Sequence, residues 1–253
     1  MTELFNLTNK IAMVTGGAIG IGKALALGLA SHGADLYLPV YDLTGVEEIK
    51  KEVEALNRRV FIHVVDLSKP ENAIAEVTLC MEKFGRLDIL INNAGIIKRS
   101  PILEGTNQDW QAVIDINLSA VYYISREASK IMKEQGSGKI INIASMLSFQ
   151  GGKFVPSYTA SKHGVAGLTK AFANELAEFN IQTNAIAPGY IETNNTAPIR
   201  ADEKRNAEIL SRIPANRWGQ VTDLVGAAIF LSSGASDYVN GHVLAIDGGW
   251  LAR

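Results

Sequence analysis

The stretch Thr15-Gly16-Gly17-Ala18-Ile19-Gly20-Ile21-Gly22 decides the fold. It follows an apolar run at residues 11–14 and leads into a helical pattern over residues 22–32, the strand–turn–helix context in which dinucleotide phosphates bind. Gly16 permits a tight turn, Gly20 would let the backbone approach a pyrophosphate, and Gly22 would let the helix pack close to the sheet. The free N–H groups at the helix N-terminus would then attract the phosphates. A glycine-rich turn without a ligand is the alternative.

Short apolar runs alternate with longer amphipathic stretches along the rest of the chain. This alternation favours a parallel sheet with helices on both faces. The sequence therefore predicts an α/β fold, with a doubly wound parallel sheet of seven strands in a single domain over residues 1–253, because no linker, repeat or composition break divides it. The predicted strands are 11–14, 36–40, 60–65, 87–91, 139–143, 181–187 and 242–246, and the predicted helices are 22–32, 45–57, 71–84, 107–135, 158–180 and 221–232.

The composition excludes several classes of partner. The chain has 253 residues and a formal net charge of −2, which gives no electrostatic reason to expect nucleic acid or an anionic membrane. No apolar run reaches roughly 18 residues, and no secretory signal pattern is visible, so we expect no membrane span and a cytoplasmic protein. The histidines are scattered and Cys80 lies in an apolar helical pattern, so we predict a core thiol and no catalytic metal.

Tyr158 and Lys162 form the pattern Tyr-x-x-x-Lys. On a helix the two side chains lie on one face, about 5–6 Å apart at Cβ. A free tyrosine has a pKa of about 10, and a neighbouring ammonium favours the phenolate and lowers that pKa. A tyrosine with a pKa near ~7 could exchange a proton with an alcohol or a carbonyl. A surface tyrosine beside a solvated lysine is the alternative, so only the rest of the chain can support the catalytic interpretation.

Thr-Gly-x-x-x-Gly-x-Gly, combined with the distant Tyr-x-x-x-Lys, resembles the short-chain dehydrogenase/reductase family. Further matches follow in order over almost the whole chain, and Ser145 precedes Tyr158 by thirteen residues, the family's spacing. The resemblance implies a Rossmann-type sheet with the strand order 3-2-1-4-5-6-7. The additional matching segments are Asp66-Leu67, Asn92-Asn93-Ala94-Gly95, Asn117, Ser145, Pro188-Gly189 and Thr193.

The resemblance also implies the roles of the site residues. Tyr158 would be the general acid/base on the reacting oxygen, while Lys162 would lower its pKa and hold the nicotinamide ribose. Ser145 would hydrogen-bond the same oxygen, and Asn117 would hold a water that links Lys162 to solvent. The implied cofactor-binding residues are Thr15, Gly16, Gly20, Ile21, Gly22, Asp42, Asp66, Leu67, Asn93, Gly95, Tyr158, Lys162, Pro188, Gly189, Ile191 and Thr193.

The residues at the end of the second predicted strand indicate whether the cofactor is NAD or NADP. NAD-binding members of the family usually place an acid there for the adenosine ribose, but Val40 occupies that position. Asp42, two residues on, either replaces that acid or caps the turn. No arginine or lysine lies between Asp35 and Leu43 to receive a 2′-phosphate, and Ile19 stands where many NADP-binding relatives carry arginine. We therefore predict NAD rather than NADP.

Segments of the second half, among them residues 140–152, 193–196 and 248–253, are similar to family members that act on deoxy sugar acids. The resemblance implies that a small-molecule sugar acid is interconverted between ketone and secondary alcohol. Its carboxylate needs a cationic or multiply hydrogen-bonding partner. The expected substrate-binding residues are Ser145, Gln150, Tyr158, Arg99, Tyr190 and Asn195, and further candidate cations are Lys98, Lys153, Arg200, Arg205 and Arg217.

Residues 193 to about 214 are polar, and relatives use this segment as a mobile lid over the site. Relatives are usually tetramers, so we expect a homotetramer; Ala166, Phe172 and Phe179 could lie at an interface or in the core. Two alternative functions stay open. One is another short-chain reductase acting on gluconate, polyol-derived or 3-oxoacyl-carrier substrates. The other is a regulator that binds the cofactor without turnover, although none of the four catalytic residues is missing.

Overall fold

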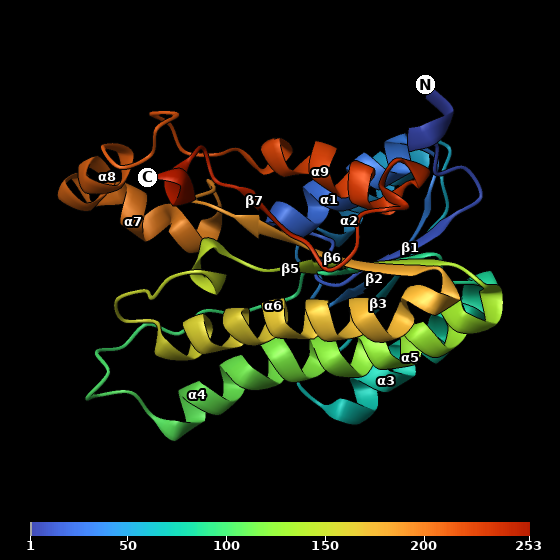
Figure 1. The fold of residues 1–253 in the computed structure, drawn as a ribbon, viewed down its shortest axis with the longest axis horizontal. Coiled ribbons are helices and arrows are strands. Elements are labelled where there is room, and N and C mark those ends of the chain that lie inside the picture. The colour runs from blue at the N-terminus through green and yellow to red at the C-terminus, as the bar shows by residue number, and fades with distance from the viewer. Residues whose placement is uncertain (1) are drawn as a thin grey trace.

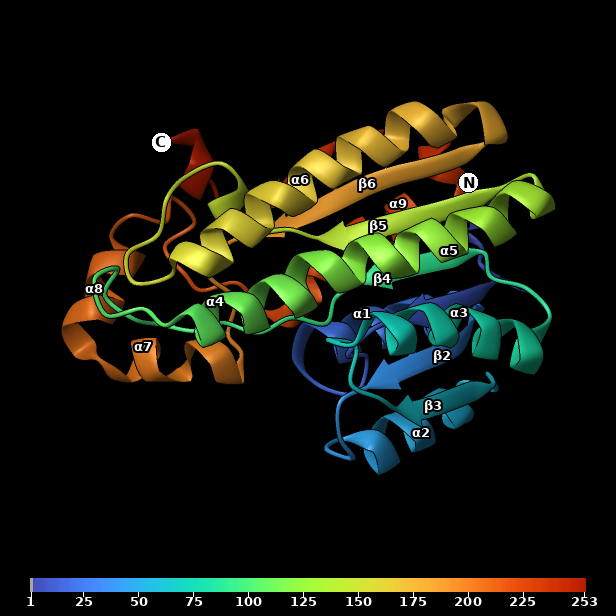
Figure 2. The ribbon, with the colours of Figure 1, turned by 90° about the horizontal axis from the view of Figure 1, so that it is seen from below.

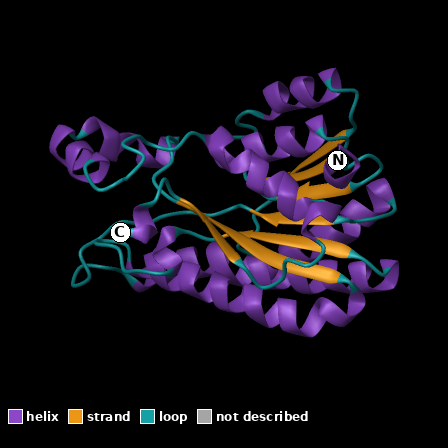
Figure 3. Ribbon diagram, turned by 45° about the horizontal axis from the view of Figure 1, so that its top comes forward, coloured by secondary structure: helices purple, strands orange, loops and turns teal. Residues whose placement is uncertain are grey.

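Seven parallel strands form one sheet at the centre of the computed structural model, which describes residues 2–253 (Figure 3). The strand order β3-β2-β1-β4-β5-β6-β7 confirms the predicted order and the Rossmann-type fold. All neighbouring strands are parallel. The strands are β1 (Ile11–Val14), β2 (Asp35–Val40), β3 (Val60–Val64), β4 (Ile89–Asn92), β5 (Gly138–Ile143), β6 (Ile181–Pro188) and β7 (Val243–Ile246).

Helices cover both faces of the sheet (Figure 1). One face carries α1 (Gly20–Ser31), α2 (Val46–Ala55) and α9 (Val225–Ser232), and the other carries α3 (Pro70–Phe84), α4 (Asn107–Ile114), α5 (Ala120–Gln135) and α6 (Pro156–Leu176). Two short helices, α7 (Ala197–Ala201) and α8 (Glu203–Leu210), lie beyond the carboxyl ends of the strands, where the arrowheads point in Figure 2. They belong to the segment expected as a lid. No helix of the described chain is both long and apolar enough to cross a membrane.

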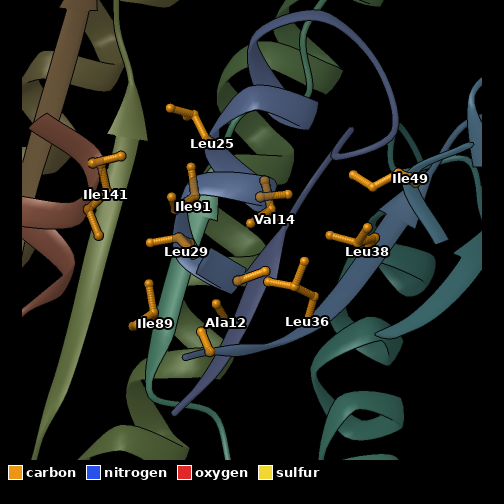
Figure 4. Close-up of a cluster of buried hydrophobic side chains, with 14 of the residues drawn as sticks. Ala12, Val14, Leu25, Leu29, Leu36, Leu38, Ile49, Ile89, Ile91 and Ile141 are labelled. Carbon is orange, nitrogen blue, oxygen red and sulfur yellow. The ribbon is translucent and has the colours of Figure 1, made fainter. Parts of the chain in front are cut away.

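The strands are apolar on both faces because alternate side chains enter two different clusters. Leu36 and Leu38 of β2 pack under α1 and α2, in the cluster drawn in Figure 4, whereas Tyr37 between them packs toward α3. Each such large side chain contributes about 1.5–3 kcal/mol when it is fully buried. Cys80 is buried in the second cluster, as predicted. The sheet is therefore held from both sides, and its carboxyl edge is a rigid base for a site.

The helix predicted over residues 107–135 is interrupted by a π-helical turn, Asp115–Ser119, between α4 and α5. Such single turns insert one residue into a helix and often occur at functional sites. The apolar spacing could not reveal the turn, since one inserted residue still leaves spacings of three or four. The turn carries Asn117, one of the predicted catalytic residues.

The close packing of α1 against α9 can be tested by substituting glycines on these two helices. An added Cβ at Gly28 would lie 2.4 Å from Cγ1 of Val225, so we expect Gly28→Ala to destabilise the protein by about 1–3 kcal/mol. Gly226→Ala on α9 is the matched control, since no atom lies within 4 Å of its added Cβ. The control should stabilise by roughly 0.5–1 kcal/mol. The measurement is the free energy of unfolding of both variants in denaturant. Equal stabilities of the two variants would contradict the close packing at Gly28.

Candidate active site

One cleft of about 2690 Å³ runs along the carboxyl ends of the strands. Ligands of open α/β sheets bind at this edge. The cleft is lined by the loops that follow β1 to β6, by the first turns of α1 and α6, and by the lid helices. Every predicted site residue lines it except Thr15 and Asn117.

The glycine loop has the shape that a pyrophosphate needs. Gly16 and Gly20 have φ values of +65° and +55°, and nothing lies within 4 Å of a Cβ added at Gly20. A Cβ at Gly22 would lie 2.2 Å from the carbonyl oxygen of Gly16, so α1 packs too closely for any side chain there. Ile19 caps α1 without a side-chain hydrogen bond, which leaves backbone N–H groups for an anion. These features fit a bound dinucleotide.

Thr15 has a different place from the one expected. Its side chain is buried and does not line the cleft. Its Oγ1 accepts hydrogen bonds from the backbone N–H groups of Asn93 and Ala94, both at 2.9 Å. The Asn93 amide donates in return to the carbonyl oxygen of Thr15, also at 2.9 Å. The Thr15 side chain therefore connects the glycine loop to the end of β4, and a contact of this residue with the cofactor stays a prediction.

Two carboxylates lie at the ends of β2 and β3. Asp42 accepts a hydrogen bond from the Thr44 N–H at 2.8 Å, and Asp66 accepts one from the Ser68 N–H at 3.0 Å. Hydrogen bonds from Thr44 and from Ser68 lower the pKa values of Asp42 and Asp66, respectively, so both remain ionised at neutral pH. Asp42 thus caps its turn and also lines the cleft, and the two roles left open by the sequence do not exclude each other.

Ser145, Tyr158 and Lys162 come together at the base of the cleft. Ser145 lies two residues beyond the end of β5 and caps a short 3₁₀ turn, Met146–Ser148, with its Oγ accepting from the Leu147 N–H at 3.1 Å. Tyr158 and Lys162 lie in the first turns of α6, and the Lys162 Nζ atom is 5.5 Å from the centre of the Tyr158 ring. The predicted helical pairing of these two side chains is present.

The electrostatic part of that prediction, a Tyr158 pKa lowered by Lys162 beside a bound cofactor, stays a prediction. In this structure burial raises the pKa of Tyr158, while hydrogen bonding by Ser145 and the positive charge of Arg99 act in the opposite direction. The Lys162 ammonium donates to the carbonyl oxygen of Ile143 at 2.5 Å. Burial also lowers the pKa of Lys162 to about 8. The base of the cleft therefore disfavours both charged forms.

Asn117 lies behind the cleft rather than in it, and its side chain is fully buried. Its amide nitrogen donates to the Ile96 carbonyl at 2.9 Å and to Ser161 Oγ at 3.3 Å, and its amide oxygen accepts from the Ile96 N–H at 2.9 Å. Both amide donors are thus used inside the protein. The side chain connects the π turn, the loop after β4 and α6, and the water expected there stays a prediction.

The candidate cations differ in whether they line the cleft and in whether they already bind a group of the protein. Arg217 does not line the cleft, because it forms two hydrogen bonds with Asp223. Arg200 is also outside the cleft lining, with Glu192 at 3.8 Å. Arg99 lines the cleft and donates to the carbonyl oxygen of Asn195 at 3.1 Å, so it joins the loop after β4 to the lid.

An aromatic wall was missed by the sequence analysis. Tyr190, which was predicted, packs edge-on against Trp250 and Trp218, with ring centres 4.9 Å and 5.3 Å away. Arg212 and Trp250 also line the cleft. No spacing in the sequence indicates this cluster, since its members come from three separate segments, around residues 190, 212–218 and 250.

The glycine loop and the serine–tyrosine–lysine set together define a dinucleotide-dependent oxidoreductase. The family model for short chain dehydrogenases matches residues 10–204, and the chain belongs to this family. It is an oxidoreductase that acts on CH–OH groups with NAD(P). The described residues hold no group of three or more His, Cys, Asp or Glu side chains placed to bind a metal ion.

Two curated relatives share a name. The chain is 52% identical over 251 residues to 2-dehydro-3-deoxy-D-gluconate 5-dehydrogenase of Bacillus subtilis (strain 168), covering 99% of this chain and 98% of the relative. It is 52% identical over 250 residues to the protein of that name from Escherichia coli (strain K12), covering 98% of each. The fold is also similar to a crystal structure of an Agrobacterium tumefaciens protein named as a 2-deoxy-D-gluconate 3-dehydrogenase, with bound NADP. The TM-score is 0.92, the sequences are 47% identical, and the match covers 99% of each chain.

The raised pKa of Tyr158 sets the sign of the pH dependence. Alcohol oxidation needs the phenolate as base, so its kcat/KM should rise by about tenfold or more between roughly pH 6 and pH 9. Ketone reduction needs the protonated phenol, so its kcat/KM should stay nearly constant over the same range, which lies below the raised pKa of Tyr158. Initial rates in both directions across this range provide the measurement. An oxidation rate that declines as the pH rises would contradict the assignment of Tyr158 as the base.

Proposed function

We propose that this protein interconverts a ketone and a secondary alcohol on a deoxy sugar acid of the 2-dehydro-3-deoxy-D-gluconate or 2-deoxy-D-gluconate type, in the breakdown of uronates. The observation that carries the proposal is the 52% identity over 99% of the chain to a relative of that name. This similarity extends over the lid and the final turn as well as over the catalytic residues. Two of the cleft cations, Arg99 and Arg212, form no ion pair among the described residues and would suit the carboxylate of such a substrate.

The proposed chemistry follows from the residues at the base of the cleft. During oxidation the Tyr158 hydroxyl, as phenolate, would take the proton of the substrate alcohol, and during reduction it would return a proton to the ketone oxygen. Ser145 would hydrogen-bond the same oxygen and stabilise its developing charge. The cofactor supplies the hydride acceptor or donor, and its oxidised ring carries a positive charge. Lys162 would hold the cofactor ribose, and Asn117 keeps α6 in register with the loop after β4.

We propose NAD as the cofactor. The cleft wall at the end of β2 contains Val40, Tyr41 and the anionic Asp42, which would repel a 2′-phosphate. Lys23 lines the same end, but it is already paired with Glu48 at 2.9 Å and Glu52 at 3.1 Å. Among the described residues, that wall therefore offers no unpaired cation to a phosphate. The remaining cofactor contacts would come from the predicted residues that line the cleft.

The proposed substrate contacts lie on both sides of the reacting oxygen. Arg99 would bind the end of the substrate that carries the reacting oxygen, since its positive charge acts to lower the pKa of Tyr158. Gln150, Tyr190 and Asn195 line the cleft and would serve the substrate hydroxyls. We propose that residues 193–214, which contain α7 and α8, close over the bound ligands. The single functional domain, the homotetramer and the cytoplasmic location remain predictions.

A panel of sugar acids tests the function. We expect NADH-dependent reduction of 2-dehydro-3-deoxy-D-gluconate-type ketones with a kcat/KM at least about tenfold above that for 5-keto-gluconate, a difference of about 1.4 kcal/mol in transition-state binding. Tyr158→Phe should abolish turnover while the KD for NADH stays nearly unchanged. A preference for gluconate-type ketones, or for 3-oxoacyl carriers, would replace the proposed substrate. Activity that survives in Tyr158→Phe would refute the mechanism.

The cofactor preference is tested separately. With the same substrate, kcat/KM for NAD should exceed that for NADP by about tenfold, and Asp42→Ala should reduce this preference by weakening repulsion of the 2′-phosphate. Thr44→Ala is the control variant, because it leaves the carboxylate in place. A tenfold preference of the wild-type enzyme for NADP would show that the proposal is wrong.

A further inference from the structure

Arg212 lies at the base of the lid, where residues 211–215 meet the final turn of the chain, Trp250–Ala252. Its guanidinium carbon lies 4.1 Å from the ring centre of Trp250. Two bonds hold the surrounding backbone: Arg253 Nη1 donates to the Ser211 carbonyl at 3.0 Å, and the Ala215 N–H donates to the Gly248 carbonyl at 3.0 Å. Arg212 is thus a cation whose position is set by the lid base rather than by the short lid helices.

The stacking leaves this cation ready to bind. A guanidinium that stacks on an aromatic ring uses its flat face, while its N–H donors point outward in the plane. Across residues 2–253, the Arg212 side chain makes no hydrogen bond or ion pair to a protein group. It lines the cleft and is exposed. A carboxylate fits such a fork through two parallel hydrogen bonds.

Most other cations of the cleft are already engaged. Lys98 lies 3.5 Å from Asp109, and Arg205 lies 3.1 Å from Glu208. Arg99 donates to the lid backbone and acts on Tyr158, which places its charge at the reacting end. Lys153 has no ion pair in the described chain, but it is an exposed, flexible ammonium without the planar fork.

The aromatic wall beneath Arg212 extends as far as the residue next to Ser145. Trp250 is 5% exposed and packs in one cluster with Met146, the residue that follows Ser145. Tyr190 packs against Trp250 in the same wall. The wall therefore runs from the catalytic serine to Arg212, and a substrate lying along it would have its reacting carbon near Ser145 and its other end near Arg212.

We propose that Arg212, held on the face of Trp250, binds the carboxylate of the sugar acid and so selects acids over neutral sugars. The inference rests on the proposed function and adds to it the residue that sets charge specificity. Arg99 and Arg212 then have separate tasks. Arg99 acts near the reacting oxygen, whatever the charge at the far end of the substrate, whereas Arg212 recognises that charge.

The test compares the sugar acid with its neutral primary amide. Arg212→Gln should lower kcat/KM for the acid by about 10- to 100-fold, mainly through KM, while kcat/KM for the amide changes less than about threefold. Arg99→Ala should impair both substrates. Arg217→Gln, at an arginine that lies outside the cleft lining and is paired with Asp223 at 2.7 Å, is the matched control and should change neither by more than about threefold. Trp250→Leu should reduce the preference for the acid in the same direction, because the guanidinium loses its support.

Each outcome has one meaning. Equal effects of Arg212→Gln on acid and amide, or no effect on either, would overturn the inference while leaving the proposed function intact. Loss of acid preference in Arg99→Ala alone would move the carboxylate site to Arg99. A wild-type enzyme that turns over none of the deoxy sugar acids would refute the proposed function and this role of Arg212 together. Melting temperatures within about 4 °C of wild type, a change of about 1–2 kcal/mol for a chain of this size, would establish that the variants are folded.

Discussion

The attachment of Lys162 to the turn after β5 is the constraint on which the catalytic geometry depends. Its ammonium donates to the Ile143 carbonyl, and its own backbone carbonyl accepts from the Ser148 hydroxyl at 2.7 Å. Both partners belong to the short segment that also carries Ser145. The strand that leads to the serine and the helix that presents the tyrosine are thus held together through one residue. Such support fixes a reacting constellation more accurately than a flexible loop does.

Desolvation shifts the pKa values of both Tyr158 and Lys162. Desolvation raises the pKa of Tyr158 and lowers that of Lys162 to about 8, so each charged form is less favoured than it is for a free side chain. If Tyr158 is the proposed base, the positive charge of Arg99 and that of the oxidised cofactor would favour its phenolate during oxidation.

The sequence predicted the parallel sheet and the position of the cleft because those features depend on local pattern, whereas the strand order came from the family resemblance. The alternation of Leu36, Tyr37 and Leu38, for example, indicates a strand buried on both faces. The π turn at Asn117 and the wall around Trp250 depend instead on contacts between distant segments, and no spacing encodes them. The bond from the Lys162 ammonium to the Ile143 carbonyl could not be predicted for the same reason, since that carbonyl lies on another element.

The tie between Thr15 and Asn93 joins residues 78 positions apart in the chain. The phosphate loop can therefore have its final shape only when β4 is docked beside β1, which closes a long stretch of chain. A truncated chain that ends before β4 would contain the glycine sequence without the contacts that hold it. Bound cofactor should accordingly report complete folding of this half of the sheet rather than formation of the first strand and helix.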